Sequence, residues 1–338
     1  MNGESHNLDC LRAVAVLCVF VCHAVSMTGH YLGNLGRVGV VLFFIHTSLV
    51  LMLSLQRDEE KISWIRFMVR RIFRIYPLAI IGVLVYFPLA IPETIWLPSG
   101  SSADLNLRTF LINISLLQNV FPAADVPSVL WSLPFEVQMY ALLPFLFVLV
   151  RNRSRLDLIA LWLIFAACAL MGAVFAPGPI ATFCQYVPCF MGGVICFGLK
   201  RSEKLPAWLL PIVLVTVVYF YTLTNAGART AIGFWPLCLG LGLLIPNFRE
   251  MRSPIATRCF AIIAKYSFGI YLSHVLCLHF AIKYLGGFGI ALAIPATLLV
   301  SWLAFHAIEQ PMIRAGKHIG SAIALRQRKF PSRCPATS

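Results

Sequence analysis

The feature that most constrains this chain is a series of long apolar runs separated by short polar stretches. Most of the runs are close to the roughly 20 residues that an α-helix needs to cross a bilayer. They cover residues 12–32, 36–56, 75–92, 131–150, 157–177, 180–199, 206–224, 230–246, 259–281 and 289–309. Hydrophobic residues make up 59% of the 338 residues and charged residues only 12%, far from the balance of a soluble domain. The sequence therefore predicts an all-α, polytopic integral membrane protein with about ten transmembrane helices.

Basic residues set the expected orientation of these runs. The chain has 27 Lys and Arg against 13 Asp and Glu, a net charge of +14. They gather in short clusters between apolar runs, which is typical of membrane topology and argues against a nucleic-acid partner. With the N-terminus inside, 22 of the 27 fall on the cytoplasmic side, and four fall outside: Arg37, Arg108, Arg229 and Lys283. We therefore expect a multi-pass protein of the cytoplasmic (inner) membrane, in contact with membrane lipids, with both termini cytoplasmic.

The cysteines do not suggest a metal or a disulfide framework. All 11 are scattered, mostly inside apolar runs, with no Cys-x-x-Cys pair and no Cys/His ligand spacing. Such cysteines are typical of small buried hydrophobic residues. We expect no metal site and no tightly bound cofactor.

Three stretches do not fit simple spans. Residues 56–74 are too charged to cross and have helical apolar spacing, which predicts an interfacial helix on the cytoplasmic side that leads into the third run. Residues 110–121 form an apolar patch too short to span, either re-entrant or an external segment that lines a cavity. Residues 317–338 predict a basic, mobile cytoplasmic tail, separate from a transmembrane domain over 1–316.

Arg12 and His23 share the first apolar run and are eleven residues apart. On a helix this is close to three whole turns, so both side chains point along one face, about 16 Å apart. A titratable group in hydrocarbon is costly unless it faces a partner or a water-filled cavity, which makes the pair a candidate site. The alternative is a signal anchor whose Arg12 snorkels to the headgroups while His23 packs among its neighbours.

Arg71 and Arg74 lie at positions i and i+3 at the predicted cytoplasmic mouth of the third run. Two guanidinium groups on one helix face suit the bidentate recognition of phosphate groups. The same charges would also serve as positive-inside residues that touch lipid phosphates.

Two further polar groups interrupt apolar runs. Glu136 follows Trp131 at the predicted outer start of the fourth run, either as a functional carboxylate or as a first-turn acid stabilised by the helix dipole. His274 lies in the ninth run, where it either faces the same interior as His23 or bonds a neighbouring helix.

Six motifs, in order along nearly the whole chain, resemble those of the membrane-bound acyltransferase-3 family. They are LDxLRAxAVxxVxxxH at 8–23, GVxLFF at 39–44, RRxxRIxP at 70–77, WSLxxExxxYxLxP at 131–144, YSxxIYLxH at 266–274 and EQP at 309–311. The chain departs from the family pattern at four positions, where Val41, Thr47, Ser48 and Val137 replace an acid, a Ser-Gly pair and a second Glu.

The resemblance implies ten transmembrane helices, an acyl-CoA co-substrate bound from the cytoplasm, and O-acylation of a carbohydrate or lipid-linked glycan, with acetyl as the acyl group. It places the family's Arg-to-His pattern on Arg12 and His23, and its Arg-x-x-Arg pattern on Arg71 and Arg74. A neutral imidazole can accept a proton from a sugar hydroxyl. The expected roles are therefore catalysis by His23 and Glu136, acyl-CoA binding by Arg12, Arg71 and Arg74, and acceptor binding by Trp131 and His274.

A second class of function remains open from the sequence. Buried His and Glu residues also serve as proton relays in transporters, so a proton-coupled transporter or a glycan flippase is the competing hypothesis, with a membrane scaffold more distant. A transporter would predict internal pseudo-symmetry, and no internal repeat is visible.

Overall fold

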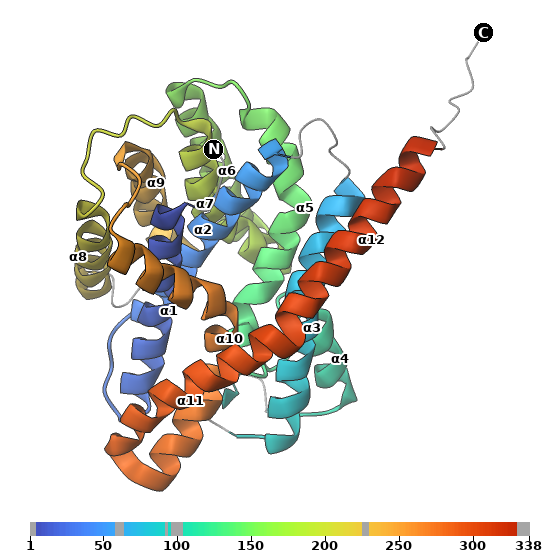
Figure 1. The fold of residues 1–338 in the computed structure, drawn as a ribbon. Coiled ribbons are helices and arrows are strands. Elements are labelled where there is room, and N and C mark those ends of the chain that lie inside the picture. The colour runs from blue at the N-terminus through green and yellow to red at the C-terminus, as the bar shows by residue number, and fades with distance from the viewer. Residues whose placement is uncertain (1–4, 58–63, 92–93, 96–103, 225–229, 330–338) are drawn as a thin grey trace.

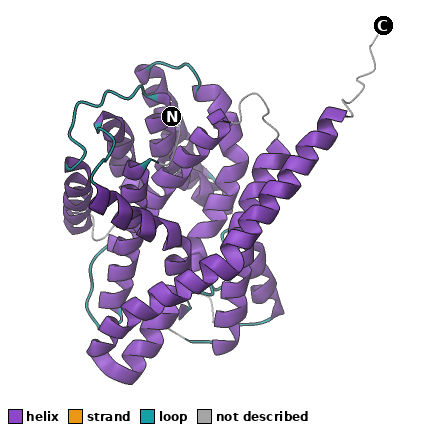
Figure 2. Ribbon diagram, viewed as in Figure 1, coloured by secondary structure: helices purple, strands orange, loops and turns teal. Residues whose placement is uncertain are grey.

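The computed structural model describes residues 5–57, 64–91, 94–95, 104–224 and 230–329, and this part of the chain is helical, without strands (Figures 1 and 2). The helices are α1 (His6–Ser26), α2 (Leu35–Arg57), α3 (Trp64–Leu89), α4 (Leu107–Ser115), α5 (Leu133–Val150), α6 (Arg155–Phe175), α7 (Pro179–Gly198), α8 (Leu209–Thr224), α9 (Trp235–Leu244), α10 (Pro254–Leu285), α11 (Gly289–Ala304) and α12 (Gln310–Lys329). Seven helical stretches among the described residues are long and apolar enough to cross a membrane. The predicted all-α, polytopic class is thereby confirmed.

Each of the ten predicted apolar runs falls on a helix, although the boundaries shift. The first run starts six residues before its predicted start, because α1 begins at His6 with Asp9 in its first turn. Helices α8 and α9 are shorter than a bilayer requires. The count of ten membrane crossings stays a prediction.

Helix α1 packs against α2 and α10, while α2 packs in turn against α7. The α2–α7 contact is close because Gly193 has no side chain. A Cβ atom there would lie 2.2 Å from both the Ile45 carbonyl oxygen and the Ser48 Oγ atom. The Ser48 hydroxyl donates a hydrogen bond to the Phe190 carbonyl across the same contact (2.7 Å). Small residues that let helix backbones approach are typical of membrane helix packing.

The stretch over 56–74, predicted as an interfacial helix that leads into the third run, is divided between two helices, and its interfacial location stays a prediction. Residues 56–57 end α2, residues 58–63 lie outside the described part, and residues 64–74 form the first turns of α3. Helix α12 lies alongside this part of α3 (Figure 1). Gly316 meets Phe73 and Gly320 meets Arg66. The predicted boundary after residue 316 falls inside α12, which continues as a helix to Lys329.

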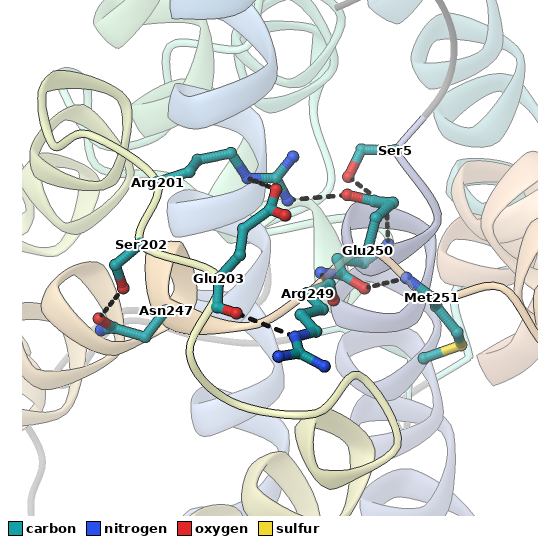
Figure 3. Close-up of polar contacts among 9 residues, drawn as sticks. Ser5, Arg201, Ser202, Glu203, Asn247, Arg249, Glu250 and Met251 are labelled. Carbon is teal, nitrogen blue, oxygen red and sulfur yellow. Dashed lines mark hydrogen bonds and ion pairs between the residues drawn. The ribbon is translucent and has the colours of Figure 1, made fainter.

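A polar cluster fixes the start of α1 to two loops (Figure 3). The Glu250 carboxylate accepts hydrogen bonds from the Ser5 hydroxyl (2.9 Å) and the Asn7 backbone N–H (3.0 Å). It also forms an ion pair with Arg201 (2.7 Å). Burial alone would raise the pKa of Glu250, but the Asn7 N–H, Arg201 and Ser5 outweigh it, so this pKa lies below its ordinary value. The cluster therefore holds α1 at the end from which Arg12 projects.

Candidate active site

Three cavities follow one another along α1. The basic cavity, about 1290 Å³, opens beside the start of α1 at Ser5 and Leu8. The His23 cavity, about 970 Å³, opens at the other end of α1, beside Ser26 and Met27. Between them lies a connecting pocket of only about 50 Å³. It shares lining residues with both larger cavities, so the three spaces form one series.

The basic cavity is strongly cationic. Its charged lining consists of seven basic side chains and one acid: Arg12, Arg57, Arg74, Arg258, Lys265, Arg314, Lys317 and Asp9. His46, which is buried, also lines it. So many cations around one space focus a positive potential that attracts a polyanion.

Arg12 and Arg74 line both the basic cavity and the connecting pocket. The Arg12 Nε–H donates to the Ser267 hydroxyl at 2.5 Å, which fixes the direction of its guanidinium group. The carboxylate of Glu309 interacts electrostatically with both arginines and is 2% exposed. Sequence reasoning assigned no role to Glu309. The sequence feature that could have pointed to Glu309 is an acidic residue at the end of an apolar run. The structure places Glu309 in a π-helical turn (Phe305–Glu309), a distortion that is frequent at functional sites.

His23 lines the cavity that we name after it, and its ring contacts His274 from α10. The His274 Nε2 atom lies 3.1 Å from the His23 Nδ1 atom, and the two rings stack with centroids 5.0 Å apart. The other nitrogen of His274, Nδ1, lies 2.9 Å from the Ile270 carbonyl oxygen. A carbonyl can only accept, so His274 Nδ1 carries a proton. In the neutral pair, His274 Nε2 then accepts from His23 Nδ1–H, which leaves the lone pair of His23 on Nε2.

His274 does not line the His23 cavity and is 1% exposed. The structure thus places this residue behind His23 rather than on the surface that an acceptor would meet. Trp131, the other predicted acceptor residue, does line the His23 cavity. Its ring packs against Phe135 and Tyr186 at centroid distances of 6.3 and 5.9 Å.

Glu136 lines the connecting pocket with Arg12 and Arg74. Its Oε1 atom accepts from the Tyr140 hydroxyl (2.5 Å) and from the Thr47 hydroxyl (3.4 Å). Among the described residues, Glu136 and His23 form no hydrogen bond with each other. Glu136 instead supplies a negative charge beside the arginines, midway between the two large cavities.

The two arginines of the Arg-x-x-Arg pattern have different surroundings. Arg74 faces the basic cavity, whereas Arg71 lines none of the three cavities. The Arg71 guanidinium lies 5.5 Å from the centroid of the Phe67 ring and interacts electrostatically with Glu136 and Tyr140. Of these two arginines, Arg74 alone is thus in a position to touch a ligand in the basic cavity.

Comparison with known proteins places the chain in a family. The family model described as an acyltransferase domain, that of the acyltransferase-3 proteins, matches residues 5–306. This range contains α1 to α11 and most of the residues that line the three cavities. The chain belongs to the acyltransferase-3 family.

Three curated relatives have names in keeping with this membership. A protein of Bacillus subtilis (strain 168), named as the peptidoglycan O-acetyltransferase YrhL, is 24% identical over 91% of this chain and 55% of its own length. The acyltransferase MdmB of Streptomyces mycarofaciens is 31% identical over 43% of this chain and 40% of its own. An O-acetyl transferase of Shigella phage Sf6 is 26% identical over 64% of this chain and 67% of its own. The chain therefore spans about half the length of the first two relatives. No solved structure matches it.

Proposed function

We propose that this protein is an integral membrane O-acyltransferase that moves an acyl group, acetyl in the first instance, from acyl-CoA to a hydroxyl of a carbohydrate or lipid-linked glycan. One observation carries the proposal: a cationic cavity and a histidine-lined cavity lie at opposite ends of α1 and share one connecting pocket. The donor and the acceptor would enter from opposite sides. The two relatives that are named as O-acetyltransferases support the choice of acetyl.

The basic cavity suits the phosphate groups of acyl-CoA. Guanidinium groups bind phosphates through paired N–H donors, and Arg74 and Arg12 stand where the basic cavity narrows into the connecting pocket. The thin pantetheine arm would extend between them toward Tyr271, which lines both the connecting pocket and the His23 cavity. The Tyr271 hydroxyl donates to the Val129 carbonyl (2.6 Å) and accepts from Ser132 (2.8 Å), so these bonds define the narrow passage.

His23 is the proposed general base. Its Nε2 lone pair would take the proton of an acceptor hydroxyl in the His23 cavity while the hydroxyl oxygen attacks the thioester carbonyl. The carbon–sulfur bond breaks, the ester forms, and the imidazolium returns its proton to the departing thiolate to give free CoA. Transfer through an acyl-imidazole on Nε2 would need the same tautomer. Glu136 is placed to balance the charge of the arginines beside the passing thioester.

The proposal also assigns a membrane side to each cavity. By the predicted topology, the basic cavity faces the cytoplasm, where acyl-CoA is available, and the His23 cavity faces outward. The protein would then act in the cytoplasmic (inner) membrane on a carbohydrate at the outer face.

A direct test uses the purified full-length chain in lipid nanodiscs with radiolabelled acetyl-CoA and a panel of saccharides. We expect free CoA to be released, and label to enter the saccharide, only when both substrates are present. Proton-coupled flux of a solute without CoA release would favour the competing transporter or flippase.

Arg74→Ala tests the donor site. Loss of one charged hydrogen bond costs about 1.5–3 kcal/mol, which corresponds to an increase of about tenfold or more in the Kd for acetyl-CoA. Arg153→Ala is the matched control, because Arg153 is exposed at the α5–α6 turn and its side chain donates to the Leu149 carbonyl. Equal acetyl-CoA binding in wild type and Arg74→Ala would assign Arg74 to lipid contact.

A further inference from the structure

The segment after α4 forms one wall of the His23 cavity. Helix α4 ends at Ser115, and the residue that caps it, Leu116, adopts a left-handed conformation (φ 55°) that turns the chain out of the helix. Gln118 and Asp125 are two of the residues from this segment that line the cavity. Within the apolar patch over 110–121, Gln118 and Asn119 line the cavity, and the choice between a re-entrant and an external segment stays a prediction. The sequence gave no indication that Asp125 would also line the cavity.

Both side chains are buried and carry an oxygen without a partner. Asp125 is 3% exposed and Gln118 is 7% exposed. The Asp125 carboxyl receives no hydrogen bond from any residue that the structure describes, and its Oδ1 atom is fully buried. The Gln118 amide is oriented by its Nε2–H, which donates to Asn113 Oδ1 (3.3 Å), so that its Oε1 atom has no donor among the described residues. Unpartnered buried oxygens are rare in native proteins and call for an explanation.

Asn113 holds this wall in place. Its side chain is fully buried. The Asn113 Nδ2–H donates to the Ala124 carbonyl (2.8 Å), and its Oδ1 atom accepts from the Val126 N–H (2.9 Å). The peptide groups on both sides of Asp125 are therefore clamped by one side chain. Asp125 is positioned by the fold although its own carboxyl bonds nothing.

We infer that Asp125 and Gln118 form a hydroxyl-recognition subsite for a polyhydroxylated carbohydrate in the His23 cavity. The inference rests on the proposed function and names residues that bind its acceptor. A sugar hydroxyl would bond the Asp125 carboxyl, which lines the cavity and has no partner among the described residues, with Gln118 beside it, and the Trp131 ring would cover an apolar sugar face. One hydroxyl of the same sugar would then lie at His23.

The surroundings favour a hydroxyl over a cation as the ligand. Burial raises the pKa of Asp125 to about 8, so most of its carboxyl is neutral at pH 7, when it can both donate to and accept from a hydroxyl. No cluster of three His, Cys, Asp or Glu side chains that could hold a metal occurs in the described ranges.

The test compares wild type with Asp125→Ala, Asp125→Asn and Gln118→Met in nanodiscs. Equilibrium dialysis with radiolabelled chitotetraose, maltotetraose and galactose measures saccharide binding without turnover. We expect Asp125→Ala to weaken binding of the best saccharide tenfold or more, Gln118→Met to weaken it less, and Asp125→Asn to stay near wild type because it keeps neutral hydrogen bonding. Asp104→Ala is the control, since Asp104 is exposed on the same side and does not line the cavity.

Two further readouts separate this subsite from a structural role and from the proposed function itself. Since the Asp125 carboxyl has no partner to lose, Asp125→Ala should have a melting temperature equal to or above that of wild type. Its Kd for acetyl-CoA should be unchanged, so loss of donor binding would count against the proposed function rather than against the subsite.

The inference is overturned if wild type binds none of the saccharides, if Asp125→Ala binds them as wild type does, or if that variant unfolds at a lower temperature. It is also overturned if Mg²⁺ or Ca²⁺ raises the melting temperature of wild type but not of Asp125→Asn, since Asp125 would then be a cation ligand.

Discussion

At the scale of single residues, the proposed role of His23 depends on the chain of hydrogen bonds from the Ile270 carbonyl through His274 to His23. It fixes which nitrogen of His23 holds the lone pair and aims that ring into the cavity. A base held in the right tautomer is more effective than the same residue free to rotate, because small misplacements of a reacting group are costly. His274 is thus a positioning residue rather than part of the acceptor surface.

His274→Leu should therefore lower kcat by up to about 100-fold and leave the KM for acetyl-CoA unchanged. His274→Gln retains an acceptor atom toward His23 and should restore part of the loss. His279→Gln is the control from the same helix, because His279 lines none of the three cavities. If His274→Leu and His274→Gln behave alike in steady-state kinetics, the histidine pair is a packing contact.

Part of this site could be predicted from the sequence. The helical period alone places Arg12 and His23 on one face, and the same period places Glu136 and Tyr140 one turn apart, where they do bond. The pairing of His23 with His274 joins residues 251 positions apart. No local pattern encodes such a contact, because it is set by how α1 and α10 pack. Asp125 was missed because its place depends on how the segment after α4 folds back, where Asn113 bonds the peptide groups on both sides of Asp125.

At the scale of elements, the start of α1 is held by Glu250 through three hydrogen-bonding groups. The pKa of Glu250 in the folded protein is depressed, so its ionised form contributes stability. That contribution is fully present above the ordinary carboxyl pKa of about 4.3 and is lost as the pH falls through the lower folded value.

Glu250→Gln should accordingly lower the melting temperature near pH 7, and its difference from wild type should shrink as the pH falls below about 4. Differential scanning fluorimetry across pH 3–8 measures this. Glu203→Gln is the control in the same cluster (Figure 3), because the Glu203 side chain is 52% exposed and lies 4.0 Å from Arg201. A melting difference independent of pH would show that Glu250 acts through packing.

The continuity of residues 64–74 with the third run could be predicted, because the helical apolar spacing runs on into the apolar part of α3. The helix after residue 316 could not be predicted. Its basic residues suggested a mobile tail, yet α12 packs there along α3. Gly316 and Gly320 allow these two charged helices to approach closely, a tertiary effect that hydropathy does not report.

At the scale of the whole molecule, the two large cavities open at opposite ends of α1. Ser5, near the start of the chain, and Lys317, in α12, line the same basic cavity, so both ends of the described chain lie toward one side. The predicted topology requires both ends to lie on one side, and the assignment of that side to the cytoplasm stays a prediction.

Reporter fusions test that topology. A fusion at the C-terminus should report the cytoplasm, and one inserted near residue 226, between α8 and α9, should report the outer side. The same side for both fusions would contradict the ten-span topology and the assignment of donor and acceptor to opposite faces.

A comparison of wild type with His23→Gln decides whether His23 is the base for acyl transfer. Turnover and acetyl-CoA binding are measured on His23→Gln protein that elutes as a single monodisperse species in detergent, beside wild type. A general base contributes about 10²–10⁴-fold to the rate, so we expect kcat to fall by that factor while the Kd for acetyl-CoA stays at the wild-type value. If folded His23→Gln protein acylates a saccharide at the wild-type rate, His23 is not the base.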